Sequence, residues 1–398
     1  MTVVARSEPV PRTSRRFSWD VIRVVAILLV LLGHFTGLAS TIPGIEPYPV
    51  RIDLRFGTIT LLVLSGYFIG PALRRGAPGR WFRTRLARLL PAYLAAVLLV
   101  YVVSRYAVVR FNGGEHQQGL LGLLFLDPIM PPEPAPDALP AWHVPDLNDL
   151  LLHLFLLHEW NPDGWHRIDG SYWTMPVQVA AFAAAALLWR SGMHRRVGAP
   201  PVLWSAMAIS AVARAVRDYV GVLPAATGML RAYLFAAGVA IWLWQQRRLS
   251  SAQLGALLAT ALVIQCFHGP WYAVLGFALM LGAMCAAARG PDWDVGVLRS
   301  LRRPISWLAG ISYGLYLVHQ QIGYVVARTL SEAGVSPWWL RLSVVAGVAL
   351  VLGWLLTVLV ERPAYRRLAP RRTAPAVVRP TPSVGSHGTR GTFVGGPP

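Results

Sequence analysis

Apolar blocks of about twenty residues recur along the chain and constrain its fold more than any other feature. The hydrocarbon core of a bilayer, roughly 30 Å thick, needs about 20 helical residues to cross. Backbone groups in lipid must bond within their own segment, so each block is expected to be a helix. Only 14% of the residues are charged, against roughly 25% in soluble domains. The sequence therefore predicts an all-α, polytopic membrane protein.

About ten spans can be drawn along the chain. Residues 110–171 form the longest connection between them, which is acidic and rich in proline. The expected spans are 21–40, 56–73, 87–109, 172–189, 202–220, 225–244, 252–268, 271–288, 305–327 and 338–360.

Arginine, which accounts for all 37 basic residues, gathers in every second connection and near both ends. The net charge of +19 could indicate nucleic-acid binding. Its alternation between spans is instead typical of cytoplasmic loops, so we expect no nucleic-acid partner. We predict a multi-pass protein of the plasma membrane with both termini in the cytoplasm. Residues 1–17 form a cytoplasmic segment, 18–368 the membrane domain with 110–171 as its outer loop, and 369–398 a disordered cytoplasmic tail.

Two ionisable residues in the first span are candidates for function. Arg23 and His34 are eleven residues apart, so on a helix they share a face and lie about 16 Å apart along the axis. Ionisable groups inside a span are costly and often functional. Neutral imidazole is well suited to take a proton from a hydroxyl at neutral pH. The alternative is a structural histidine and an arginine that extends to the membrane surface.

Five short motifs then follow in order between about 18 and 368: Asp20-x-x-Arg23 with Gly33-His34-Phe35, Val63–Ile69, Arg85–Tyr93, Ile311–His319, and Glu361-Arg362-Pro363. Together they resemble the signature of the acyltransferase-3 family of membrane-bound O-acyltransferases. These enzymes act on glycans, glycosides and macrolide-type natural products. The resemblance implies transfer of an acyl group from acyl-CoA to a hydroxyl of a sugar, glycan or glycosylated natural product.

The resemblance also implies roles for individual residues. Arg23 and His34 match catalytic positions, with His34 as general base or as the carrier of a transient acyl group. Arg85 and Arg88 match basic positions beside the membrane, where guanidinium groups suit the phosphates of coenzyme A. They could equally be positive anchors of the span. Acyl-CoA is then a donor substrate, and no bound cofactor is expected.

Further polar or aromatic residues are candidates to line a cavity: Asp20, Ser65, Tyr67, Trp173, Gln178, Tyr313 and His319. Gln178 stands where the family commonly has a glutamate, which places the role of that carboxylate in doubt. Ser65 raises a serine nucleophile as an alternative. Gly66 and Gly70 beside it favour close helix packing instead.

No metal site is predicted. The outer loop holds His143, His153, His158, Glu159 and His166, but these lack spacing typical of zinc ligands, such as His-Glu-x-x-His.

Two other functions remain open. A transporter would be expected to show an internal repeat and paired broken helices, and neither is evident in the sequence. A family member that has lost catalysis and acts by binding is the third hypothesis, because Gln178 replaces an acidic residue.

Overall fold

The computed structural model describes residues 16–73, 77–132, 139–160, 166–220 and 227–369. Within these ranges the regular elements are helices, and strand-type pairing is limited to an isolated bridge between Glu115 and Ile129. The all-α prediction is confirmed for them. Nearly all of the predicted tail 369–398 and most of segment 1–17 lie outside the described residues.

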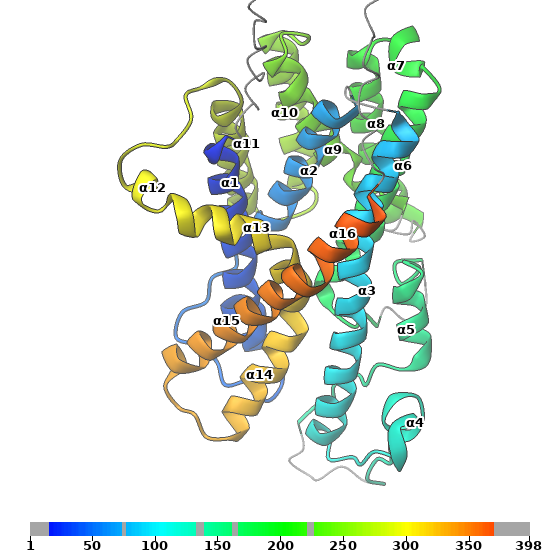
Figure 1. Ribbon diagram of the computed structural model, residues 1–398, viewed down its shortest axis with the longest axis vertical. Coiled ribbons are helices and arrows are strands. Elements are labelled where there is room, and N and C mark those ends of the chain that lie inside the picture. Colours follow the sequence, from blue (N-terminus) through cyan, green and yellow to red (C-terminus); the bar gives the residue numbers. More distant parts are fainter. Residues whose placement is uncertain (1–15, 74–76, 133–138, 161–165, 221–226, 370–398) are drawn as a thin grey trace, which may run out of the picture.

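The helices follow the chain as shown in Figure 1. Their bounds are α1 Phe17–Leu32, continued by a π-helical segment Gly33–Leu38 and a short 3-10 turn Ala39–Thr41, α2 Gly57–Leu73, α3 Pro78–Phe111, α4 Gly119–Leu124, α5 Leu147–Leu154, a 3-10 turn Gly170–Trp173, α6 Thr174–Arg190, α7 Met193–Arg196, α8 Ala199–Val220, a 3-10 turn Met229–Arg231, α9 Ala232–Gln245, α10 Ser251–Cys266, α11 Trp271–Arg289, α12 Gly296–Ser300, α13 Arg302–Val318, α14 Gln320–Glu332, α15 Trp338–Leu355, a π-helical segment Leu356–Glu361 and α16 Arg362–Leu368.

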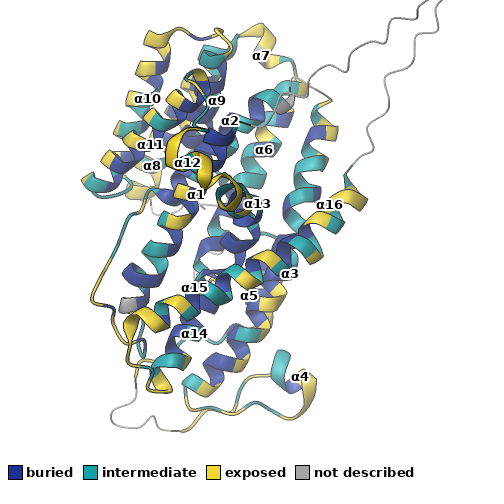
Figure 2. Cartoon of the chain, turned by 60° about the vertical axis from the view of Figure 1, so that its left-hand side comes forward, coloured by how far each residue is buried: buried dark blue, intermediate teal, exposed yellow. Residues whose placement is uncertain are grey.

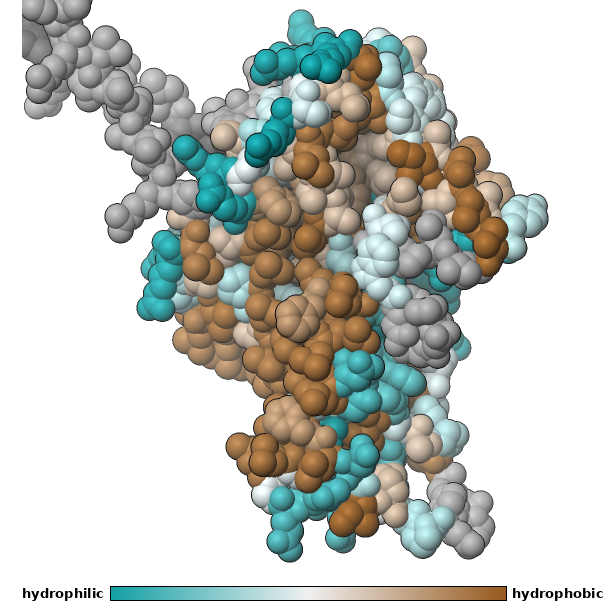
Figure 3. All heavy atoms as spheres, turned by 90° about the vertical axis from the view of Figure 1, so that its right-hand side faces the viewer, coloured by the Kyte–Doolittle hydropathy of each residue, from teal (hydrophilic) through white to brown (hydrophobic). Residues whose placement is uncertain are grey.

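Six helical stretches among the described residues are long and apolar enough to cross a membrane. They are Phe17–Leu38, Pro78–Phe111, Gly170–Arg190, Ala199–Val220, Trp271–Arg289 and Trp338–Leu368. Helices α2, α9 and α10 are apolar but shorter. Figure 3 shows a broad hydrophobic band over the middle of one face, with hydrophilic residues toward both ends of the molecule. The protein therefore has the helices of a multi-pass membrane protein, while the number ten stays a prediction.

One predicted span differs in the structure. Residues 305–327 were expected to form one helix, but α13 ends at Val318 and α14 begins at Gln320. His319 stands at this break. A helix end leaves backbone carbonyls without partners inside the helix, and these carbonyls position the residues described below.

Helices α2 and α9 make the most extensive helix contact in the described chain, and most residues of α9 are buried (Figure 2). A Cβ atom on Gly66 would lie 2.5 Å from the carbonyl oxygen of Phe235, and one on Gly238 would overlap the backbone of Val63 and Tyr67. A Cβ on Gly70 would overlap the ring of Trp242. The predicted close packing at Gly66 and Gly70 is confirmed.

Replacing Gly238 by Ala should lower the melting temperature of the detergent-solubilised protein. The methyl group meets backbone atoms, which cannot move aside, and overpacking of this kind costs about 1–3 kcal/mol. Gly255 is the matched control, because its Cβ would meet nothing within 4 Å. Gly255→Ala should be neutral or slightly stabilising, since Ala favours the helix. Equal melting temperatures for the two variants would contradict the packing argument.

In the outer loop, α5 begins with a capping box. The Asp146 side chain accepts from the N–H of Asp149 at 2.7 Å, and the Asp149 side chain accepts from the N–H of Asp146 at 3.2 Å. The apolar stretch 147–157 after Asp146 predicts a short capped helix in this loop. The structure confirms the capped helix, which spans Leu147–Leu154 and ends three residues earlier than predicted.

Candidate functional site

His34 and His319 form a pair of stacked imidazoles, called the histidine pair below. His34 Nδ1 lies 2.7 Å from His319 Nε2, and the two rings are 4.9 Å apart at an interplanar angle of 8°. His34 comes from the π-helical segment that continues α1, and His319 from the break between α13 and α14. His319 is fully buried and His34 partly buried. The structure thus gives His34 a second imidazole as its neighbour.

The hydrogen bonds of His319 assign the tautomers of both rings. His319 Nδ1 lies 2.8 Å from the carbonyl oxygen of Tyr316. A carbonyl only accepts, so this nitrogen carries the proton and His319 Nε2 is left as an acceptor. With both rings neutral, His34 Nδ1–H donates to it. The free lone pair of His34 is then on Nε2, where it can accept a proton from a hydroxyl.

The segment that follows the outer loop fixes the break at His319. Asp169 is fully buried and accepts from the N–H of Ser171 at 2.8 Å and from its hydroxyl at 2.6 Å. Its other oxygen accepts from the N–H of Gln321 at 2.9 Å, in the first turn of α14. The hydroxyl of Tyr172 donates to the carbonyl of Leu317 at 2.9 Å. In the sequence, Asp169 is one of several acidic residues of the 110–171 loop and was not singled out. The signal that could have identified it is the run Asp169-Gly170-Ser171, which is typical of a turn or helix cap.

Three arginines line a cavity between α1, α2, α3, α6 and α13, called the arginine cavity below. Its empty space measures about 790 Å³, including the part open to solvent. The predicted residues in its lining are Arg23, Ser65, Arg85, Arg88, Gln178 and Tyr313, and the others are Thr58, Leu61, Leu62, Leu64, Phe68, Leu89, Thr174, Phe182, Ser312 and Tyr316. The structure therefore brings together six residues that were predicted from separate sequence motifs.

The arginines differ in how firmly they are held. Arg85 donates to the carbonyl of Phe68 at 3.1 Å and lies over the ring of Phe182 at 5.6 Å. Arg88 faces Glu361 at 3.5 Å, and 43% of its side chain is exposed. Hydrogen bonds of this length are weak, so Arg88 can exchange its partner for an anionic ligand. Arg23 lies over the ring of Phe68 at 6.0 Å.

Tyr316 joins the arginine cavity to the histidine pair. It lines the cavity, and its carbonyl accepts from His319 Nδ1. Its hydroxyl donates to the carbonyl of Ser171 at 3.1 Å and lies 3.1 Å from the hydroxyl of Thr174. His34 itself lies outside the cavity lining. Tyr316 and His319 thus connect the lining of the basic cavity to the candidate base His34.

The remaining predicted residues lie outside the lining of this cavity. Asp20 accepts from the hydroxyl of Ser306 at 3.2 Å. Tyr67 donates to the side-chain oxygen of Gln245 at 2.5 Å. The guanidinium group of Arg231 lies over the ring of Trp173, 5.4 Å from the ring centroid. Their contacts are typical of packing between helices.

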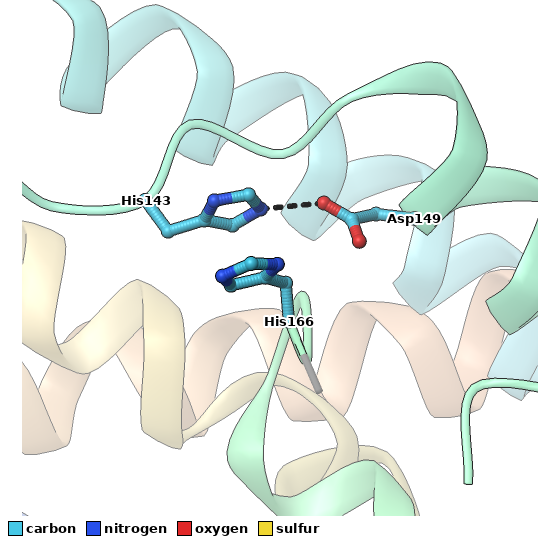
Figure 4. Close-up of side chains that lie close together, drawn as sticks. All are labelled: His143, Asp149 and His166. Atoms are coloured by element: carbon cyan, nitrogen blue, oxygen red, sulfur yellow. Dashed lines mark hydrogen bonds and ion pairs between the residues drawn. The ribbon is translucent and has the colours of Figure 1, made fainter. Parts of the chain in front are cut away.

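A second cluster lies in the outer loop (Figure 4). His143 Nε2 is 2.6 Å from the carboxylate of Asp149, and the ring of His166 stacks on that of His143 at 3.6 Å. One candidate ligand atom from each residue lies within 4.8 Å of the others. His143 and His166 were considered as metal ligands from the sequence and set aside for lack of a zinc-type spacing, whereas Asp149 was not considered. Folding of the loop brings the three residues together.

Most of the chain is similar to known proteins. The family model described as an acyltransferase domain, acyltransferase-3, matches residues 16–358. The chain is also similar to a protein of Komagataeibacter xylinus named "Putative membrane-bound transacylase BcsY", with 28% identity over 371 residues, 90% of this chain and 85% of that protein. No solved structure matches the chain.

Proposed function

The chain belongs to the acyltransferase-3 family, and on this premise we propose that it moves an acyl group from acyl-CoA to a hydroxyl of a sugar, glycan or glycosylated natural product. It is a membrane acyltransferase with several apolar helices. The observation that carries the finer proposal is the histidine pair beside a cavity lined by three arginines.

His34 Nε2 is the proposed general base. It takes the proton from the acceptor hydroxyl while the oxygen attacks the thioester carbonyl. The new C–O bond forms, the C–S bond breaks, and the departing thiolate recovers the proton from His34 to leave as the thiol of coenzyme A. When His34 is protonated, its Nδ1–H still donates to neutral His319, now as a stronger, charge-assisted hydrogen bond. An acyl-histidine route would use the same residues.

The arginine cavity is the proposed donor site. Arg85 and Arg88 both line it, and guanidinium groups bind phosphate with two parallel hydrogen bonds. Arg23 adds a third positive charge on the α1 side. Ser65, the alternative nucleophile, donates its hydroxyl to the carbonyl of Leu61 at 2.9 Å, which favours a role in the helix.

Labelled acyl-CoA tests the proposal directly. Purified protein in lipid nanodiscs, supplied with a panel of glycoside acceptors, should form an acylated product that requires His34. A transporter or a binding protein would form none. Absence of product with every acyl-CoA and acceptor, from protein that binds acyl-CoA normally, would favour the binding hypothesis.

His319 is expected to act as a positioning residue. His319→Ala should lower kcat roughly tenfold to a hundredfold, because His34 then lacks the partner that fixes its tautomer, while KM for acyl-CoA changes little. His319→Gln should recover part of kcat, since its amide oxygen can accept from His34 Nδ1–H. His268→Ala, in the α10–α11 connection, serves as control. Equal kcat in the Ala and Gln variants would contradict the tautomer argument.

We also propose that both termini and the arginine-rich connections face the cytoplasm, in the plasma membrane. Helices α7 and α4 lie toward opposite ends of the molecule (Figure 1). Reporter fusions after Met193 and Arg248 should therefore report the cytoplasm, and a fusion after Met130 the other side. A cytoplasmic signal at Met130 would refute this orientation.

A further inference from the structure

Three side chains of the outer loop present metal-ligating atoms to one another, and we propose that they bind one divalent transition-metal ion, with Zn²⁺ the best match. His143 precedes α5, Asp149 lies in its first turn, and His166 follows it in the chain. In Figure 4 both imidazoles lie beside the Asp149 carboxylate, and the three residues are called the outer triad below. The triad lies outside the arginine cavity and the histidine pair.

The distances suit a small ion after a modest adjustment. Zinc binds imidazole nitrogen and carboxylate oxygen at about 2.0–2.2 Å, so tetrahedral ligand atoms stand roughly 3.4 Å apart. The triad has its ligand atoms within 4.8 Å of one another, and His143 Nε2 is 2.6 Å from Asp149 Oδ2. An ion would replace the proton that these two atoms share and draw His166 inward. Both histidines are exposed, so their side chains can turn to do this.

Asp149 is the fixed member of the triad. Its side chain is buried, and Oδ2, the oxygen that faces His143, also accepts from the N–H of Asp146 at 3.2 Å. Hydrogen bonds of this kind orient a ligating carboxylate and are usual around metal sites. The capping box accounts for the place of Asp149. It does not account for two imidazoles stacked beside the carboxylate.

The charges around the triad also permit a cation. Arg167, next to His166 in the chain, donates to both oxygens of Glu159 at 2.5 and 3.0 Å. Its positive charge is therefore compensated by a buried carboxylate. Two imidazoles and one carboxylate suit zinc better than Mg²⁺ or Ca²⁺, which prefer oxygen ligands. Three protein ligands leave a fourth position for water.

Metal binding would stabilise the segment that holds the helix break at His319 in place. His166 is three residues before Asp169, whose carboxylate accepts from the N–H of Gln321 beside His319. An ion on the triad would tie this segment to α5 through Asp149. Zn²⁺ is therefore expected to raise the melting temperature of the protein as well as to bind.

Calorimetric titration with Zn²⁺ tests this inference without any acyl transfer. The full chain, purified without a polyhistidine tag and freed of metal with a chelator, should bind one ion. His143→Ala and His166→Ala should each weaken binding at least tenfold, and the double variant should lose it. His116→Ala, in the same loop but outside the triad, should bind as the unaltered protein does.

Two outcomes would overturn the proposal. One is the absence of saturable Zn²⁺ binding to the unaltered protein. The other is equal affinity in the His143→Ala/His166→Ala variant and in His116→Ala. Since the triad histidines are exposed, their replacement should leave the helical circular dichroism unchanged. An unchanged spectrum shows that weaker binding results from loss of a metal ligand and not from unfolding. Loss of acyl transfer with intact binding would count against the proposed function and leave this site standing.

Discussion

Replacing His34 by Ala should reduce the kcat of acyl transfer by a factor of roughly 10²–10⁴, the contribution usual for a positioned general acid or base. The reason is the free Nε2 lone pair that the bonds from His34 to His319 and from His319 to Tyr316 assign to this ring. The KM for acyl-CoA should change little, because His34 lies outside the arginine cavity. Initial rates with labelled acyl-CoA, at equal amounts of folded protein, measure both.

His34→Gln separates the two roles that this histidine could have. Glutamine can still donate a hydrogen bond to His319 Nε2 but cannot accept a proton at neutral pH. A general base predicts that the Ala and Gln variants are equally inactive. A structural histidine predicts that Gln preserves activity, and near-normal turnover in either variant would refute the assignment of His34.

The helical class, the helix cap at Asp146 and the close packing at Gly66 could be predicted because each depends on local sequence. Apolar blocks, a capping aspartate and a glycine among apolar residues act within a few turns of chain. The number of spans also depends on contacts between residues that are far apart in the sequence. The break at His319 is stabilised by Asp169 and Tyr172, which lie about 150 residues earlier, and the apolar blocks on either side of the break read as one span.

The candidate site was predictable residue by residue but not as an arrangement. Arg23, Arg85 and Gln178 were each predicted as candidates from a different motif, and the structure places them in the lining of one cavity. The pairing of His34 with His319 joins residues 285 positions apart. No periodicity in a single sequence encodes such a contact. The same reason applies to the outer triad: His143 and His166 were named from the sequence, but their grouping with Asp149 depends on the fold of the loop.

Replacing both Arg85 and Arg88 by Gln should raise the KM for acyl-CoA by roughly a hundredfold or more. Charge-assisted hydrogen bonds contribute about 1.5–3 kcal/mol each, and this variant removes at least two. An acyl-pantetheine donor has the thioester but lacks the phosphates, so its KM should change much less. The preference of the enzyme for the coenzyme A thioester should therefore largely disappear. Competition between the two donors, followed with different labels, measures that preference.

The matched control is Arg80→Gln with Arg83→Gln, which removes the same charge from the same helix. Both residues are exposed and lie outside the cavity lining. If the arginines of α3 act only as positive anchors, the two double variants should lose insertion and activity alike, with both donors. If Arg85 and Arg88 bind the donor, the control should keep its preference for acyl-CoA. A positive charge at any position in the first turns of α3 can anchor the helix, but only an arginine that lines the cavity can bind the phosphates of the donor.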